Sequence, residues 1–228
     1  MKKLLVSIFA ALLVLPTIFA QPAKDYTDSK DSDPAATAIL KKVKATYESY
    51  SSVEADFSLQ IEFPEEPVEI MKGKLFQKGD KYRIDMETQS IICDGTTVWL
   101  FLANNKEVQI NNADFGEDSG ILSPADLLRA YESGEYVYVL SNESMEDGVA
   151  VQQIEFKPLD RDSEYSKMRL TVEKSTAKIK RIKAFSRDGS RFTLSIDKLT
   201  PNKALADNKF VWNKSECPDC YVEDLRID

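Results

Sequence analysis

The sequence predicts a mainly β protein built on a long antiparallel sheet, with two amphipathic helices. About eleven segments between residues 55 and 199 alternate apolar and polar residues with the period of two that is typical of strands. Most of these segments are joined by short turns, as in antiparallel hairpins. A sheet of this size curls, so it either closes into a barrel or stays open around an apolar face with the helices as a partial plug.

The N-terminal residues have the pattern of an export signal. Lys2 and Lys3 precede an apolar stretch over residues 4–15 and a cleavage site after Ala20. We therefore expect a signal peptide over residues 1–20. A retained membrane anchor is the alternative, although the stretch is shorter than the ~20 apolar residues of a spanning helix. Residues 21–32 are polar and predict a disordered leader before one domain over residues 33–228.

Composition limits the class of protein and its partners. The 228 residues include 43% hydrophobic and 30% charged ones, which is typical of a globular domain. Without Lys2 and Lys3, 28 basic residues stand against 38 acidic ones, a charge of −10. This charge argues against nucleic acid and anionic lipid headgroups as partners. The first cysteine is Cys93, far from the cleavage site, so we expect an exported protein without a lipid anchor.

The domain is predicted to open with an amphipathic helix. Asp33 is suited to the N-cap and Pro34 to the first helical position. The residues on its apolar face are Ala36, Ile39, Leu40, Val43, Tyr47 and Tyr50. A helix of this kind packs on a sheet.

The predicted strands follow in hairpins. They cover residues 55–63, 69–78, 81–87, 90–93, 96–102, 106–110, 136–140, 149–157, 165–173, 178–186 and 191–199, with a further strand over residues 221–227. The strand over residues 96–102 is apolar on both faces, so we expect it to be covered on both sides. If the sheet stays open, its apolar face forms the wall of a cavity for an apolar ligand. The candidate wall residues, chosen by strand alternation, are Phe57, Leu59, Ile61, Phe63, Leu75, Ile84, Met86, Leu100, Ile154, Phe156, Met168, Leu170, Phe192 and Leu194.

A second helix is predicted between the strands. Pro124 begins it after Ser123, and Gly134 ends it. Its apolar residues are Leu127, Leu128 and Tyr131. The helix is a candidate lid over the wall, or else a connector between two parts of the sheet.

The residue types exclude several kinds of enzyme. The chain has no histidine, so it has no Ser-His or Cys-His nucleophile, and three cysteines are too few for a cysteine-only zinc site. The acidic clusters at residues 114–118 and 143–147 lack the spacing of a calcium loop. A pair of carboxylates for glycoside cleavage stays open, because its members need not be close in sequence. We expect no catalytic residue, no cofactor and no metal.

The cysteines are interpreted as structural. Cys217 and Cys220 have C-x-x-C spacing, which in an oxidising compartment predicts a small disulfide, with a redox role as the alternative. Their place in a loop near the C-terminus, and not at the start of a helix, favours the structural role. Cys93 has no partner and is predicted to be a buried, small apolar residue.

Four passages resemble one known family. They are YESYSSVEADF at residues 47–57, KGKLFQKGDKYRID at residues 72–85, ICDGTTVWLF at residues 92–101 followed by NNKEVQIN, and YVEDLR at residues 221–226. With these passages, residues 37–227 resemble the periplasmic outer-membrane lipoprotein carrier family (LolA), in its Bacteroidetes-type form. None of the passages carries a catalytic motif, so the resemblance identifies a scaffold.

The resemblance implies both a fold and a function. The fold is an incomplete antiparallel β-barrel with a helical lid, enclosing an apolar cavity. The function is that of a monomeric periplasmic carrier that takes acylated lipoproteins from an ATP-driven inner-membrane complex to an outer-membrane acceptor. Many carriers of the family have a lid-contacting arginine at the end of the second strand, where this chain has Gly79. Either Lys78, Lys81 or Arg83 replaces it, or the lid is held differently. The alternative function is a periplasmic lipid-binding sensor or interaction module on the same scaffold.

Overall fold

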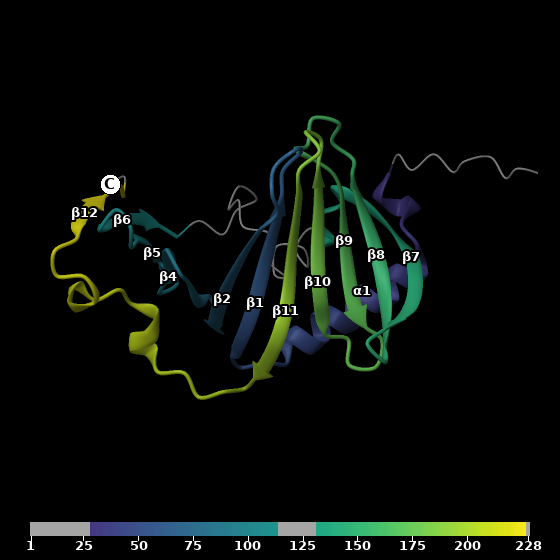
Figure 1. The fold of residues 1–228 in the computed structure, drawn as a ribbon. Coiled ribbons are helices and arrows are strands. Elements are labelled where there is room, and N and C mark those ends of the chain that lie inside the picture. Colours follow the sequence, from purple (N-terminus) through teal and green to yellow (C-terminus); the bar gives the residue numbers. More distant parts are fainter. Residues whose placement is uncertain (1–27, 114–130, 227–228) are drawn as a thin grey trace, which may run out of the picture.

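The computed structural model describes residues 28–113 and 131–226 and shows one open sheet with a helix against one of its faces (Figure 1). The predicted signal peptide lies outside the described residues. The helical elements are η1 (Ser29–Asp31), α1 (Pro34–Glu48), η2 (Asp207–Phe210) and η3 (Lys214–Glu216), of which the three η elements are 3-10 turns. The strands are β1 (Val53–Glu62), β2 (Glu69–Lys78), β3 (Lys81–Met86), β4 (Gln89–Cys93), β5 (Thr97–Leu102), β6 (Glu107–Asn112), β7 (Tyr136–Glu146), β8 (Val149–Pro158), β9 (Tyr165–Glu173), β10 (Ile179–Ser186), β11 (Arg191–Pro201) and β12 (Tyr221–Asp224).

The sheet consists of two antiparallel meanders that meet at β1 and β11. Its strand order is β12-β6-β5-β4-β3-β2-β1-β11-β10-β9-β8-β7. Strands β1 to β6 form one meander and β7 to β11 the other. The sheet does not close, because β7 and β12 stand at its two edges. The predicted architecture, a mainly antiparallel incomplete barrel, is confirmed.

The structure differs from the sequence prediction at several elements. β12 is the one parallel strand among the described residues, with Val222 beside Val108 of β6. β7 continues to Glu146 instead of ending at Leu140, through a bulge that lets it follow β8 to the end of their hairpin. Every residue of β5 is partly buried, so the strand is partly covered on both faces. The region predicted as a leader also differs at its end, where η1 forms a capped turn.

Asp33 connects the start of α1 to the edge of the sheet. As predicted, it is the N-cap: its Oδ1 accepts a hydrogen bond from the Ala35 N–H at 2.8 Å. Its Oδ2 accepts from the Leu140 N–H of β7 at 3.2 Å, and its own N–H donates to the Tyr138 carbonyl at 2.9 Å. The Tyr138 N–H donates to Ser32 Oγ. Free backbone groups of an edge strand are thus paired by the chain that leads into the helix.

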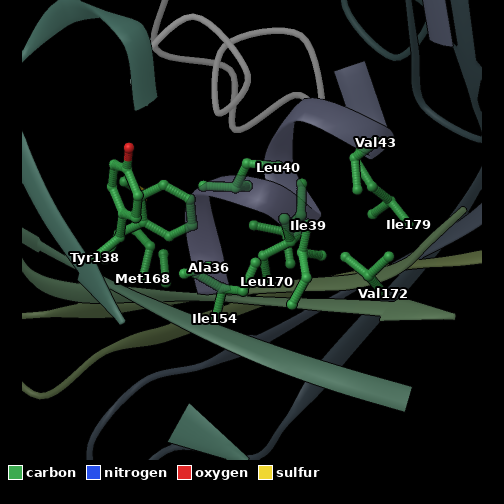
Figure 2. Packing of buried hydrophobic residues seen from close by; sticks show 13 residues of the cluster. Ala36, Ile39, Leu40, Val43, Tyr138, Ile154, Met168, Leu170, Val172 and Ile179 are labelled. Atoms are coloured by element: carbon green, nitrogen blue, oxygen red, sulfur yellow. The ribbon is translucent and has the colours of Figure 1, made fainter. Parts of the chain in front are cut away.

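The main core lies between α1 and strands β7 to β10. The helix buries Ala36, Ile39, Leu40 and Val43. These side chains point at an apolar layer of the sheet (Figure 2). The buried members of this layer are Tyr138, Ile154, Phe156, Met168, Leu170, Val172, Ile179, Ile182 and Ala184. Tyr47 adds a polar contact at the end of the helix, where its hydroxyl accepts a hydrogen bond from the Ile179 N–H at 3.2 Å. Burial raises the pKa of this hydroxyl, so Tyr47 stays neutral.

The C-terminal segment, residues 202–226, runs past the meander of β1 to β6 and contains β12 near its end (Figure 1). Leu205 and Phe210 pack with Phe76 of β2 in a second, small core. The Lys209 ammonium lies 3.8 Å from the centroid of the Phe76 ring, a cation–π contact. The segment therefore attaches to β2 and β6 by packing and by backbone pairing.

A disulfide lies between η3 and β12. Cys217 and Cys220 are bonded, and the Cys220 N–H also donates to the Cys217 carbonyl. Cys93 is free and buried, as expected.

We predict that Asp33→Ala lowers the free energy of unfolding by about 1–3 kcal/mol, because it removes a helix cap and the acceptor of the Leu140 N–H. Asp33→Asn is the matched control: its amide oxygen can cap the helix, but its amide nitrogen cannot accept from Leu140. Urea denaturation of the three proteins measures the effect. Equal stability of Asp33→Ala and the wild type would contradict the connecting role.

We predict that the double substitution Cys217→Ser/Cys220→Ser lowers the free energy of unfolding by at most about 2 kcal/mol, because the disulfide closes a very short loop. Thermal unfolding of oxidised, reduced and substituted protein measures this. The reduced wild type serves as the control and should match the double variant. A much larger loss would mean that the disulfide organises more of the chain than its own loop.

Candidate functional site

The face of the sheet that α1 contacts, here called the inner face, is apolar across nearly all strands. Residues directly opposite each other on antiparallel strands point to the same face. Ile154 lies opposite Leu170, and Leu170 lies opposite Ile182. Ile182 lies opposite Leu194, which is the partner of Leu59 in β1. One continuous row of aliphatic side chains therefore joins the two meanders.

The same face continues through the first meander. Ala55 of β1 lies opposite Leu75, and Leu75 lies opposite Ile84. Beyond them, Ile91 lies between Ile84 and Leu100. All the predicted wall residues that lie in strands share this inner face. Phe63 follows the end of β1 and is 40% exposed, and its ring packs edge-on against Phe192 at 6.3 Å.

Helix α1 divides this wall into two parts. The covered wall consists of Ile154, Phe156, Met168 and Leu170, which are buried in the core under α1. The half-buried wall consists of Leu59, Ile61, Leu75, Ile84, Met86, Leu100, Phe192 and Leu194. The first group holds the helix on the sheet. Only the second group keeps apolar surface that is not used up by packing.

Phe57 and Gly73 occupy the centre of the half-buried wall. They are direct partners, and Gly73 is in turn the partner of Met86. A Cβ atom at Gly73 would lie 2.5 Å from Cζ of Phe57 and 2.8 Å from the Asp85 carbonyl oxygen. Both distances are shorter than atomic contact allows. The absence of a side chain at Gly73 therefore leaves a gap in the wall, and the Phe57 ring lies in it.

Sequence alternation missed part of this wall. Met71, Ile91 and Ile196 lie on the inner face, opposite Leu59, Ile84 and Phe57 respectively. Met71 and Ile91 follow the same alternation as Leu75 and Leu100, so the signal was present. Gly73 had no such signal, because a glycine contributes no side chain to an apolar pattern.

The outer face of β1 and of β8 to β10 carries ion pairs. Glu155 pairs with Lys167 and Arg169, and Glu62 pairs with Lys183. Burial raises the pKa of Glu155, but hydrogen bonds from Arg169 and Lys167 outweigh it and hold that pKa below its usual range. The Lys183 hydrogen bond likewise lowers the pKa of Glu62. The outer face of β2, in contrast, carries Phe76 of the small core. The half-buried wall on the inner face is the candidate place for an apolar ligand.

Most of the predicted lid, including Leu127 and Leu128, lies outside the described residues. Its end is described: residues 131–133 are helical, and Gly134 has a φ of 81°. The Tyr131 ring packs edge-on against Tyr138 at 6.2 Å. Glu132 forms an ion pair with Lys44 of α1 at 2.6 Å. Residues 131–133 are therefore attached to α1 and to the core beneath it.

The three basic residues expected to replace the lid-contacting arginine are bound elsewhere. Lys78 and Lys81 approach Asp207 at 3.0 and 3.6 Å. Arg83 binds Asp85 and Glu216. All three therefore hold the C-terminal segment, and most of the lid that one of them would contact lies outside the described residues. The physical reason for Arg83 is strand alternation: its partner Phe76 packs against Leu205 and Phe210, on the face opposite α1.

No helix in residues 28–113 or 131–226 is long and apolar enough to cross a membrane. In the same residues, no group of cysteine, aspartate or glutamate side chains is arranged to hold a metal ion.

Comparison with protein families agrees with the fold. The model of the family described as "Outer membrane lipoprotein carrier protein LolA" matches residues 48–213. The match begins at the end of α1, includes β1 to β11 and stops before Cys217. No curated protein sequence matches the chain.

Solved structures align with this chain at low sequence identity. An uncharacterised conserved protein from Thermus thermophilus aligns with a TM-score of 0.56 at 11% identity, over 85% of this chain and 99% of that one. A LolA superfamily protein from Nitrosomonas europaea aligns with a TM-score of 0.42 at 17% identity, over 78% and 97%. The lipoprotein LppX from Mycobacterium tuberculosis aligns with a TM-score of 0.49 at 12% identity, over 77% and 99%.

We predict that Gly73→Ala lowers the free energy of unfolding by about 1–3 kcal/mol, because the added methyl group overlaps the Phe57 ring and the Asp85 carbonyl. Urea denaturation of Gly73→Ala, Phe57→Ala and the double variant forms a cycle. In the Phe57→Ala background, Gly73→Ala should lower the free energy of unfolding by less, because only the overlap with the Asp85 carbonyl oxygen remains. Strict additivity would show that the ring does not occupy the gap.

Proposed function

The chain belongs to the LolA family of outer membrane lipoprotein carriers, and from this membership and the half-buried wall we propose that it carries lipoproteins from the inner to the outer membrane by binding their acyl chains. The carrier is periplasmic, exported by its signal peptide, and works as a monomer. Its partners are an ATP-driven inner-membrane complex that releases the cargo and, where one is present, an outer-membrane acceptor.

The observation that carries this proposal is the half-buried wall. It presents aliphatic and aromatic side chains from β1 to β5 and from β11 on one face of an open sheet. Such a surface recognises methylene groups without directional contacts, so it suits acyl chains that differ in length and branching. The outer face of β1 and of β8 to β10 carries ion pairs and suits water.

The energetics of transfer favour a wall of this kind. Burial of about fifteen methylenes at ~0.8 kcal/mol each recovers about 12 kcal/mol relative to water. The cargo leaves one bilayer and enters another, so the carrier needs only to match a bilayer approximately. A wall that bound much more tightly would not release its cargo. A partly buried wall meets this requirement, because an acyl chain is more stable on it than in water but not much more stable than in a bilayer.

The covered wall has a different task in this proposal. Ile154, Phe156, Met168 and Leu170 contact α1 in the core, and α1 is attached to the β7 edge by Asp33. This half supplies stability and a fixed frame. The cargo is bound by the other half, which can change its contacts without unfolding the core.

We predict that Leu59→Glu or Ile61→Glu abolishes lipopeptide binding, because a carboxylate on the wall must keep its water or be protonated at a cost of several kcal/mol. The matched control is Ile70→Glu. Ile70 lies opposite Gln60 on the outer face and is 62% exposed. It receives the same new charge one strand away, and binding should persist.

The measurement combines native mass spectrometry of protein purified from the periplasm with transfer of a labelled lipopeptide between two vesicle populations. Bound lipopeptide in the wild type and its loss in Ile61→Glu support the carrier. Binding without transfer would point instead to a lipid-binding sensor or interaction module. Full binding by a folded Ile61→Glu variant at neutral pH would show that the inner face is not the ligand wall.

A further inference from the structure

Gly73 contributes no side chain to the wall, and this leaves a gap between its neighbours. Gly73 lies in the interior of β2, whereas the other described glycines all have positive φ and lie in turns or loops. Glycine inside a strand weakens it and commonly marks a close approach of another group. Here that group is the Phe57 ring, whose Cζ and Cε1 would lie 2.5 and 2.9 Å from a Cβ at Gly73.

The side chains around the gap are apolar. Met71 and Leu75 flank Gly73 along β2 on the same face, and Met86 lies opposite it on β3. All three side chains are half-buried, whereas Phe57 is 8% exposed. Two of the three are methionines, which adapt their shape to an irregular apolar partner. The gap is thus a notch with an adaptable apolar lining and one rigid side chain inside it.

The Phe57 ring is well placed to be a stop. It comes from β1, which pairs with β11 and joins the two meanders, so its backbone is held on both sides. On one side of the ring, β2 to β5 carry half-buried apolar residues. On the other side, β11 carries Ile196, the partner of Phe57, and leads to the strands that α1 covers. A chain of methylenes lying on β2 to β5 meets the ring before it reaches the core under α1.

We propose that the Phe57 ring, which fills the notch at Gly73, sets the length of acyl chain that the wall accepts, because it occupies the space that the end of a longer chain would need. This inference rests on the proposed function and adds a specificity-determining residue to it. Phe57 acts by excluded volume, because it contributes no polar contact. Methylenes beyond the ring gain no contact with the wall and stay in water.

The test uses synthetic lipopeptides with one peptide and increasingly long saturated acyl chains, titrated against the full-length mature protein by calorimetry. In the wild type, affinity should rise about fourfold for each added methylene and then stop rising at one chain length. In Phe57→Ala, the rise should continue to longer chains, because the notch is open. Phe57→Leu, which keeps an aliphatic side chain and a filled core, should shift the limit less and covers the case that Phe57→Ala does not fold.

Leu59→Ala is the matched control. Leu59 lies on the same strand and face, two residues from Phe57, and its partner Met71 has a side chain, so no notch lies beside it. This variant should weaken binding of every chain length by a similar factor and leave the limit in place. A moved limit cannot arise from a general loss of stability, which would lower all affinities together.

The outcomes separate this inference from the proposed function. Wild-type binding with a length limit that moves only in the Phe57 variants supports the stop. Wild-type binding with the same limit in Phe57→Ala and Phe57→Leu overturns the stop and leaves the carrier intact. Absence of lipopeptide binding by the wild type overturns both.

Discussion

The packing of α1 on the sheet is the interaction on which the other features depend. A helix of 15 residues is about 22 Å long, and strands lie ~4.8 Å apart, so one such helix covers about four to five strands. The sheet has twelve. α1 packs on β7 to β10 and leaves the inner face of the remaining strands to be shielded otherwise. A partly buried apolar wall follows from this mismatch of lengths, and a wall of that kind is what a carrier of acyl chains requires.

The two meanders bury apolar side chains on different faces of the sheet. The β7 to β11 meander has its core on the inner face, under α1. The β1 to β6 meander has a small core on the outer face, where Phe76 packs with Leu205 and Phe210 of the C-terminal segment. Ion pairs from Lys78 and Arg83 to Asp207 and Glu216 hold the same segment. The first meander is therefore stabilised on its outer face, and in the proposed function its inner face binds the ligand.

Strand alternation explains why so much of the wall followed from the sequence. Successive side chains of a strand point to opposite faces, so the apolar members of 57, 59 and 61 or of 84 and 86 must share a face once the strands form. Hairpin turns then transmit that parity from strand to strand through direct partners such as Leu75 and Ile84. This is local information. It does not say which half of the wall a helix covers. Ile154 and Leu170 follow the same alternation as Leu59 and Leu75, but only Ile154 and Leu170 lie under α1.

The sequence by itself determined the mainly β class, the capped helix at Asp33, the order of hairpins and the apolar face, because turn residues and a period of two act over a few neighbouring residues. Only the tertiary structure decided that β1 pairs with β11, that α1 packs on the second meander, that β12 joins β6 in parallel and that Lys78, Lys81 and Arg83 bind the C-terminal segment. These contacts join residues that are far apart in the chain, and no local pattern specifies such partners. Gly73 shows the same limit most clearly. A glycine adds nothing to an apolar pattern, and only the pairing of β1 with β2 shows that the Phe57 ring occupies the space beside Gly73.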